Sequence, residues 1–251
     1  MTCKYSRNLA RFYDTIYHQL RDSVDTRFFI EETKKARGKI LEVGTGTGRL
    51  FTSLLETGAD VYGIDVSDSM LDILKAKLTS EEHFRVSNQN IIDFHFDFKF
   101  NLIMAPFRVM MHLIEKEDQL RALNNVRDHL VEKGIYIFDV FIPDPAQLTK
   151  GFDNYMDFEG DYEPGKKIRR FVTTVPDLVN QIIDVKFLLE WDDEDGIKND
   201  VFTFPMRFYF RYELEYLLER SGFGKNYIML GDYNGTPLNK NSKEFIVICH
   251  R

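Results

Sequence analysis

The sequence predicts an α/β fold in which a doubly wound, mostly parallel sheet of seven strands is closed by an antiparallel hairpin and carries a small antiparallel β insert. Three observations support this prediction. A β-favouring run at residues 40–43 passes through a glycine-rich turn into a helical pattern. Strand and helix patterns then alternate as far as residue 141, as a parallel sheet requires. Between about residues 151 and 209, β-rich runs separated by turn residues indicate antiparallel strands.

Two helices are predicted before the first strand. The first covers residues 5–20, where apolar and tyrosine side chains recur at helical spacing. The second runs from Ser23 towards Arg37, and Gly38 is its expected stop. Packing with the hydroxyl groups at the rim accounts for most of the tyrosines in the first helix.

The run Ile40–Val43 is the expected first strand, and the turn Gly44-Thr45-Gly46-Thr47-Gly48 follows it. Glycines let the backbone turn sharply and leave room for a ligand to lie against it. The helix that follows has its apolar positions at Leu50, Phe51, Leu54 and Leu55. Its first turn presents free N–H groups at the glycine-rich loop.

The spacing of the glycines differs from a dinucleotide-binding fingerprint. The third glycine comes one residue early, and Arg49 stands where that fingerprint has glycine. Glu42 precedes the first glycine by two residues, where a carboxylate suits a cationic ligand better than a pyrophosphate. The second strand, residues 61–65, ends in Asp65, whose carboxylate can accept hydrogen bonds from both hydroxyls of a ribose.

These residues resemble the motifs of class I S-adenosylmethionine-dependent methyltransferases. The acid and three glycines of the family's first motif are matched by Glu42, Gly44, Gly46 and Gly48, and the ribose-binding acid is matched by Asp65. The resemblance implies a Rossmann-like fold and S-adenosyl-L-methionine as cofactor. A βα turn without a ligand and the site of a nicotinamide dehydrogenase are the alternative interpretations of the loop.

The resemblance also implies the other cofactor contacts. The Tyr13-Asp14 pair is expected over the cofactor, Val66 and Met70 beside the adenine, and Asn90 with Ile91 at the adenine edge. The full set of predicted cofactor-binding residues is Tyr5, Tyr13, Glu42, Gly44, Thr45, Gly46, Gly48, Asp65, Val66, Met70, Asn90, Ile91 and Ala105. Core packing explains Val66 and Met70 equally well, and an ordinary turn explains Asn90.

Tyr13 and His112 are the candidate catalytic residues. His112 follows the predicted fourth strand, residues 100–105, at the edge where α/β sheets bind ligands. A packed structural role is the alternative for this histidine. The methyl group of a sulfonium is already activated, so a base is needed only if the acceptor must lose a proton. The remaining histidines have no metal-ligand spacing, and no metal site is expected.

The rest of the parallel sheet follows from the alternation. A helix is expected at residues 70–78, a short third strand at 84–86, a helix at 120–130 and a fifth strand at 135–141. Pro143 and Pro145 then break the pattern. The insert is expected to contain strands at 168–174, 181–187 and 201–204, with the acidic run 192–196 at a hairpin tip. A helix from Tyr212 to Gly222 and strands at 227–230 and 244–248 close the sheet.

We therefore divide the chain into a cofactor-binding core, residues 1–150 and 210–251, and a β-rich insert, residues 151–209. The insert is expected to cover the acceptor site. Its alternative role is to form a homodimer, because exposed antiparallel edges pair readily.

Composition narrows the classes of function. A net charge of −7 argues against a nucleic-acid partner held by a general basic surface. No apolar run is long enough to span a bilayer, and the N-terminus has no apolar signal core, so a cytoplasmic protein is expected. Cys3 and Cys249 lie at opposite ends and form no metal or redox motif.

The function expected from the resemblance is methyl transfer from S-adenosylmethionine to nitrogen or oxygen of a small molecule, such as an amine or amino sugar. The alternatives are a non-catalytic protein that binds this cofactor and an NAD-dependent oxidoreductase. The first would keep Gly44, Gly46 and Asp65 but lack a pocket for the acceptor.

Overall fold

The computed structural model describes residues 5–20 and 23–251, so Cys3 lies outside the described residues. The first half contains α1 (Arg7–Leu20), α2 (Val24–Lys35), β1 (Ile40–Val43), α3 (Arg49–Glu56), β2 (Val61–Asp65), α4 (Asp68–Lys77), η1 (Ser80–Arg85), β3 (Val86–Asn88), β4 (Phe100–Ala105), η2 (Val109–His112), α5 (Lys116–His129) and β5 (Leu130–Phe141). The second half contains α6 (Pro145–Lys150), β6 (Phe152–Glu163), β7 (Lys166–Asp177), β8 (Ile182–Asp193), β9 (Gly196–Arg207), α7 (Arg211–Arg220), β10 (Tyr227–Leu230) and β11 (Glu244–His250).

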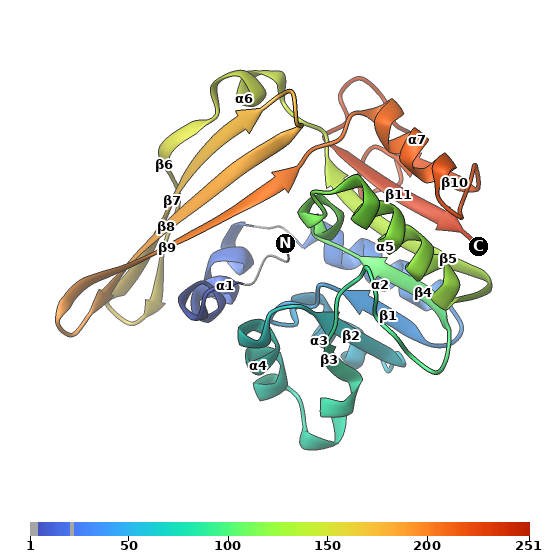
Figure 1. The fold of residues 1–251 in the computed structure, drawn as a ribbon. Helices are drawn as coiled ribbons and strands as arrows, with labels where there is room; N and C mark the ends of the chain where they lie inside the picture. The colour runs from blue at the N-terminus through green and yellow to red at the C-terminus, as the bar shows by residue number, and fades with distance from the viewer. Residues whose placement is uncertain (1–4, 21–22) are drawn as a thin grey trace.

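The main sheet has seven strands in the order β10-β11-β5-β4-β1-β2-β3. Strands β1 to β5 pair in parallel, while β11 is antiparallel to both β5 and β10. The chain order reverses between β1 and β4, so the carboxyl ends of these strands border the crevice where this architecture binds ligands. The predicted fold class, with its closing antiparallel hairpin, is confirmed (Figure 1).

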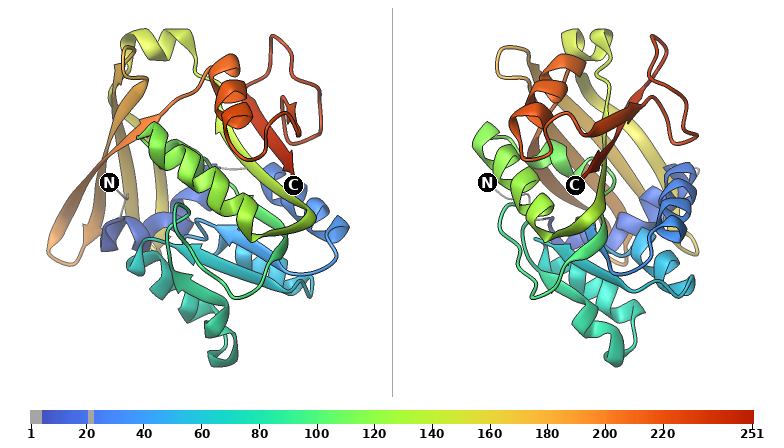
Figure 2. Two further views of the ribbon diagram at one scale, coloured as in Figure 1. Left: turned by 45° about the vertical axis from the view of Figure 1, so that its right-hand side comes forward. Right: turned by 90° about the vertical axis from the view of Figure 1, so that its right-hand side faces the viewer.

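Apolar side chains cover both faces of this sheet, as expected for strands buried on both sides. Leu41 and Val43 of β1 belong to one core, which includes side chains of α5 and α7. Ile40 of the same strand belongs to the core on the opposite face, together with Phe51 of α3 and Phe29 of α2. Figure 2 shows the helices on the two sides of the sheet.

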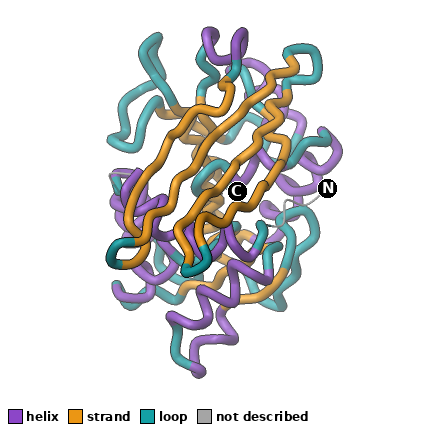
Figure 3. Tube along the Cα trace, turned by 90° about the vertical axis from the view of Figure 1, so that its left-hand side faces the viewer, coloured by secondary structure: helices purple, strands orange, loops and turns teal. Residues whose placement is uncertain are grey.

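The second sheet has four antiparallel strands, β6-β7-β8-β9, which Figure 3 shows side by side. Its inner face packs on α1, where Leu9, Phe12 and Ile16 meet apolar side chains of the sheet. Arg170 of β7 is also buried on this face; it donates two hydrogen bonds to Asp157 and one to the Tyr17 hydroxyl. Helix α1 contacts both this sheet and α4, and it therefore joins the two sheets at the crevice (Figure 1).

Apart from shifted element ends, such as the start of β5 at Leu130 instead of residue 135, three features of the structure differ from the predictions. The third strand is β3, Val86–Asn88, because Thr79 and Glu82 form a capping box that starts a 3-10 helix through Arg85. Pro145 does not end the pattern, because it occupies the first turn of α6 and Asp144 caps that helix through the N–H groups of Ala146 and Gln147.

The third difference is β6, Phe152–Glu163, which has no counterpart among the predicted strands of the insert. It is an edge strand, and most of its side chains are exposed or half-buried. The hairpin between β8 and β9 turns at Asp193 and Gly196, within the acidic run. Within residues 5–20 and 23–251, no helix is long and apolar enough to cross a membrane.

Candidate active site

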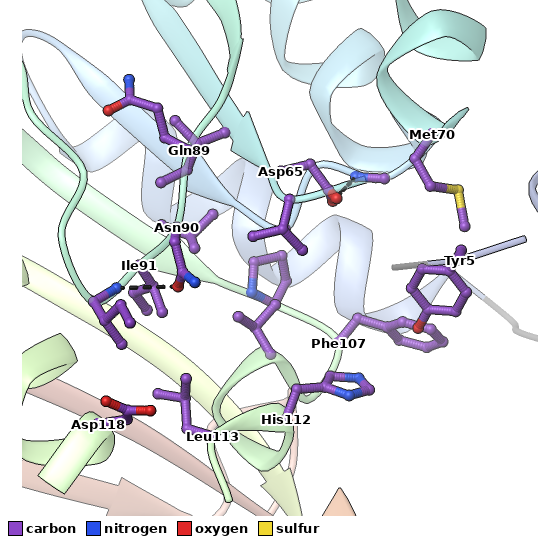
Figure 4. A pocket seen from close by; sticks show the side chains of 18 of the residues that line it. Tyr5, Asp65, Met70, Gln89, Asn90, Ile91, Phe107, His112, Leu113 and Asp118 are labelled. Carbon is purple, nitrogen blue, oxygen red and sulfur yellow. Dashed lines mark hydrogen bonds between the residues drawn. The ribbon is translucent and has the colours of Figure 1, made fainter. Parts of the chain in front are cut away.

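A pocket lies where β1, β2 and β4 end (Figure 4). Most of the predicted site residues line it, namely Tyr5, Tyr13, Gly44, Gly46, Asp65, Val66, Met70, Asn90, Ile91 and His112. Glu42 and Thr45 line a smaller adjoining cavity, which shares Tyr13, Gly44 and Gly46 with the main pocket. Gly48 and Ala105 line neither cavity. The specific roles of these residues remain predictions.

The three glycines of the turn have different reasons to be glycine. All have positive φ, 74° at Gly44, 54° at Gly46 and 91° at Gly48. A Cβ atom at Gly44 would lie 2.5 Å from Cγ2 of Val109, and one at Gly48 would lie 2.3 Å from Cδ1 of Leu74. A Cβ atom at Gly46 would meet no atom of the described residues within 4 Å. Gly46 therefore borders open space in the pocket, whereas Gly44 and Gly48 allow close packing.

Asp65 at the end of β2 is 9% exposed and bound to the backbone through both carboxyl oxygens. Its Oδ2 accepts from the N–H of Gly46 at 2.9 Å, and its Oδ1 accepts from the N–H of Ser67 at 2.8 Å. Burial raises the pKa of Asp65, and these backbone hydrogen bonds oppose the rise. A carboxylate has about four acceptor positions, so two remain for hydroxyl groups of a ligand.

Glu42 in β1 is 2% exposed, and its Oε2 has no hydrogen-bond partner among the residues that the structure describes. Burial raises the pKa of Glu42 well above its ordinary value, while the charge of Arg49 opposes the rise. Within this described part of the chain, the hydroxyl of Thr45 is also buried without a hydrogen-bond partner. Both residues line the small cavity of about 30 Å³ beside Phe107. Unpaired buried acceptors are costly, so these two oxygen atoms fit a ligand group that carries a positive charge and donates N–H hydrogen bonds.

Arg49, which replaces the third glycine of a dinucleotide fingerprint, has a structural partner. Its guanidinium group donates to both carboxyl oxygens of Asp25, at 3.2 and 2.5 Å, and to the hydroxyl of Thr26 at 2.7 Å. Asp25 is 3% exposed. This pair connects α3 to α2 behind the glycine turn. Arg49, at the position of the missing glycine, therefore has a structural role in holding the two helices together.

Asp14 connects α1 to the same turn. Its Oδ1 accepts from the Thr47 hydroxyl at 2.6 Å, and its Oδ2 accepts from Nζ of Lys77 at 2.6 Å. Lys77 also donates to the backbone carbonyl of Thr47 at 2.7 Å. These contacts hold α1 against the turn and thereby keep Tyr13 at the pocket. The sequence predicts this position of Tyr13 only through the resemblance of Tyr13-Asp14 to the family motif.

Asn90 and Ile91 line one end of the pocket (Figure 4), and Val66 is also among the lining residues. The Oδ1 of Asn90 accepts a hydrogen bond from the N–H of Ile92 at 3.3 Å. Such a bond is typical of an ordinary turn asparagine, the alternative interpretation of this residue. Its side chain nevertheless lies along the pocket wall, so this hydrogen bond does not remove it from reach of a ligand.

The other end of the pocket is aromatic. The ring of Tyr5 stacks on Phe202 of β9 with 5.2 Å between centroids, and it lies 6.1 Å from the ring of Tyr13. His112 in η2 lies 5.6 Å from the ring of Phe204. Its Nδ1 is buried and has no hydrogen-bond partner within residues 5–20 and 23–251. Burial lowers the pKa of His112 to about 4, so the ring is neutral near pH 7.

Sequence analysis missed several lining residues. Gln89, Pro106, Phe107, Val109 and Leu113 also face the pocket. All follow β3 or β4, and ligands bind beyond the ends of such strands. Their position after the strand ends could therefore have identified them, although only His112 was predicted as a site residue in the segment after β4.

Comparisons with known proteins agree with this arrangement. Residues 40–134 match the family model of the methyltransferase domain. The Bacillus subtilis protein YqeM is 30% identical over 113 residues, which make up 45% of this chain and 46% of YqeM. The chain thus matches about half the length of that relative. The cypemycin N-terminal methyltransferase of Streptomyces is 23% identical over 98% of this chain and 97% of that protein.

Solved structures share the fold over nearly the whole chain. An S-adenosylmethionine-dependent methyltransferase from Clostridium acetobutylicum superposes with a TM-score of 0.74 at 20% identity, covering 97% of each chain. The sugar N-methyltransferase KedS8 from Streptoalloteichus superposes with a TM-score of 0.76 at 17% identity, covering 100% of this chain and 94% of that one. The separate four-stranded sheet is thus included in the aligned length.

Proposed function

Because this chain carries a class I methyltransferase domain, whose cofactor is S-adenosylmethionine, we propose that it transfers a methyl group from this cofactor to a nitrogen atom of a small amine. The observation that carries the proposal is the unpaired, buried Oε2 of Glu42 beside the glycine turn. A pyrophosphate would be repelled by this carboxyl group, whereas the ammonium of the cofactor would satisfy it. In this assignment Asp65 binds the ribose, and Asn90 with Ile91 binds the adenine.

The chemistry is an in-line displacement. The cofactor supplies a methyl group on a positively charged sulfur, and the sulfur–carbon bond breaks as the nitrogen–carbon bond forms. The residues of the chain must align the acceptor and exclude water. Tyr5, Tyr13 and Phe107 provide an aromatic wall for this purpose, because their rings line the pocket with apolar surface.

His112 is suited to orient the acceptor. Its neutral ring can accept a hydrogen bond through Nδ1, which has no partner within the described chain. A pKa of about 4 makes it a weak base near neutral pH. We therefore assign it the role of accepting an acceptor N–H, so that the nitrogen lone pair remains free for the methyl group. The proton that the product ammonium loses then passes to water.

Two relatives support nitrogen over oxygen. KedS8 is named as a sugar N-methyltransferase, and the Streptomyces relative is named for the N-terminus of cypemycin. The first name states transfer to nitrogen, and the second refers to an N-terminus, which carries an amine. An amino sugar is our first candidate acceptor and a peptide N-terminus is our second.

We further propose that residues 151–209 form an insert that covers the acceptor site. Its strand β9 supplies Phe202, stacked on Tyr5, and Phe204, beside His112. The insert therefore contacts Tyr5 and His112 at the aromatic end of the pocket. Water would enter this end of the pocket more freely without it.

The outer face of the insert is the proposed homodimer surface. Register places Met156, Phe171, Leu188 and Val201 in one row across its four strands. Met156 is 47% exposed and Val201 is 49% exposed, so the row ends in accessible apolar side chains. Two copies that pair through this row would bury it.

Turnover with methyl-labelled S-adenosylmethionine tests the proposal. The acceptors are nucleotide-linked amino sugars, short peptides with free N-termini, and hydroxyl analogues of both. We expect label on the nitrogen of one amine class and none on the matched hydroxyl compounds. Transfer only to hydroxyl analogues would overturn the nitrogen assignment. Binding of S-adenosylhomocysteine without transfer to any acceptor would favour a non-catalytic protein, and binding of NADH instead would favour an oxidoreductase.

A further inference from the structure

We propose that Asp139 is a positioning residue that holds the turn after β4 in the shape that the pocket wall requires. Asp139 lies near the end of β5 and is completely buried. Its Oδ1 accepts a hydrogen bond from the backbone N–H of Arg108 at 2.6 Å. Its Oδ2 accepts from the hydroxyl of Tyr233, which lies in the loop between β10 and β11.

The turn that Asp139 holds has an unfavourable backbone. Phe107 has a φ of 61° and Arg108 a φ of 68°, so two consecutive residues with side chains lie in the left-handed region. Bulky residues rarely adopt this conformation, because Cβ approaches the carbonyl oxygen. Such strain persists only where the surrounding structure imposes it, and it is concentrated at functional sites.

Several contacts impose it here. Besides the hydrogen bond to Asp139, the Arg108 guanidinium group donates to Oε1 of Glu244 at 3.2 Å. It also lies over the ring of Phe141, 5.0 Å from its centroid. The backbone and the side chain of Arg108 are thus both fixed to the paired ends of β5 and β11. The contact through Asp139 is the one that acts on the backbone directly.

The turn determines where the pocket wall lies. Phe107 precedes the anchored N–H and lines both cavities, while Val109 and His112 follow it in η2. The Val109 side chain occupies the space that Gly44 leaves open, so a shift of η2 would also disturb the glycine turn. Figure 4 shows Phe107 and His112 on the same side of the pocket. Asp139 itself touches neither cavity, and it acts through Arg108.

A carboxyl group is an unusual choice for this buried place, because an apolar residue would avoid the cost of burying charge. Two acceptor oxygens are needed at once, one for the Arg108 N–H and one for the Tyr233 hydroxyl. Asparagine keeps one acceptor for Arg108, and its amide can donate to the tyrosine oxygen. Alanine keeps neither interaction. These two substitutions therefore separate the hydrogen bond from the charge.

The first test needs only the wild-type protein. The N–H of Arg108 belongs to no strand pairing or helix ladder, yet we expect its exchange with deuterated solvent to be slowed by at least about tenfold relative to an exposed turn amide. Unprotected exchange of this amide in the folded protein would overturn the proposal. Because no variant is involved, a failure of folding cannot obscure the result.

The second test compares Asp139→Ala, Asp139→Asn and Tyr233→Phe by exchange and by nuclear magnetic resonance of the His112 ring. We expect Asp139→Ala to speed exchange across residues 106–112 and to raise the pKa of His112 from about 4 towards 6.5, because η2 moves into water. We expect Asp139→Asn to keep the wild-type exchange rates and the wild-type pKa of His112, and Tyr233→Phe to change these two quantities little. A folded Asp139→Ala protein with wild-type exchange and His112 titration would contradict the proposal.

The inference rests on the proposed function for what the pocket binds, but neither readout needs a cofactor or an acceptor. Absence of methyl transfer would therefore leave these tests intact. Once an acceptor is known, Asp139→Ala should lower kcat and also weaken binding of S-adenosylhomocysteine, because Phe107 lines both cavities and Val109 packs against Gly44. Wild-type values of both in a folded Asp139→Ala protein would contradict the proposal.

Discussion

The backbone N–H of Gly46 donates a hydrogen bond to Oδ2 of Asp65 at 2.9 Å. Gly46 lies in the turn after β1, whereas Asp65 is the last residue of β2. One carboxyl group thus fixes the glycine turn and still presents acceptor positions to the pocket. Substitutions at these two positions test the cofactor site most closely.

We expect Asp65→Ala to weaken binding of S-adenosylhomocysteine by about 1–3 kcal/mol, the usual effect of losing hydrogen bonds to a charged group. Calorimetric titration gives the affinity. The matched control is Asp68→Ala, whose exposed carboxyl group accepts from Nδ2 of Asn88. Unchanged affinity in a folded Asp65→Ala protein would exclude the ribose assignment.

We expect Gly46→Val to abolish cofactor binding, because its side chain would enter the open space beside the turn. Gly58→Val is a close control: its φ is +79°, no atom lies within 4 Å of the added Cβ, and it borders neither cavity. Both variants should lose about 1–2 kcal/mol of stability from the left-handed backbone. Normal binding by Gly46→Val would mean that the turn is merely structural.

Glu42 should make the stability of the free protein depend on pH. Burial raises its pKa in the folded state, so the folded protein binds more protons than the unfolded chain above the ordinary pKa of 4.5. Its contribution to stability is present below 4.5 and is lost as the pH rises through the folded-state pKa. Glu42→Gln should therefore become more stable relative to the wild type as the pH increases. Denaturant unfolding at several pH values measures this, and parallel stability curves would contradict the assignment.

The same substitution should weaken cofactor binding. Glutamine keeps the shape of the side chain but has no charge to pair with an ammonium. A variant that is more stable when free yet binds S-adenosylhomocysteine less tightly separates the two effects. Equal or tighter binding by Glu42→Gln would argue against the predicted role of Glu42.

We expect His112→Phe to lower kcat by about tenfold, the order of one lost hydrogen bond in the transition state, with little change in cofactor affinity. Phenylalanine can still pack against Phe204. Since the pKa of His112 is lowered to about 4, the wild-type rate should show no inflection from this ring between pH 6 and 8. Fixed-time assays of methyl transfer across this pH range measure the rate. An inflection that disappears in His112→Phe would show that the ring titrates during catalysis.

The homodimer should depend on the apolar row of the insert. Leu188→Lys places a charge in the middle of that row and should yield a monomer by light scattering. Tyr216→Lys is the control, because Tyr216 is 70% exposed on α7, outside the insert. A wild-type protein that is monomeric at all tested concentrations would contradict the proposed surface.

The residues whose positions were predicted correctly are those that neighbouring residues in the sequence determine. Strand β1, the glycine turn and Asp65 lie within 26 positions, from Ile40 to Asp65, and hydrophobic periodicity with turn chemistry determines them. Strand β6 was missed because it is an edge strand with a weak apolar pattern. Helix α6 was missed because Pro145 can either end a pattern or occupy the first turn of a helix.

Long-range contacts could not be predicted in the same way. Arg170 and Tyr17 are 153 positions apart, and Tyr233 and Asp139 are 94 apart. Nothing near either residue in the sequence indicates its partner, because the fold as a whole brings them together. The strained turn at Phe107 and Arg108 was missed for this reason, although its position after β4 was recognised.

The binding preference of the wild-type protein tests the central claim most directly. Calorimetric titration with S-adenosylhomocysteine and, separately, with NADH measures which cofactor the pocket accepts. The arrangement of Glu42, Gly46 and Asp65 predicts saturable binding of S-adenosylhomocysteine with one site per chain and no measurable heat from NADH. Binding of NADH in preference to S-adenosylhomocysteine, or binding of neither, would contradict the proposed methyl transfer.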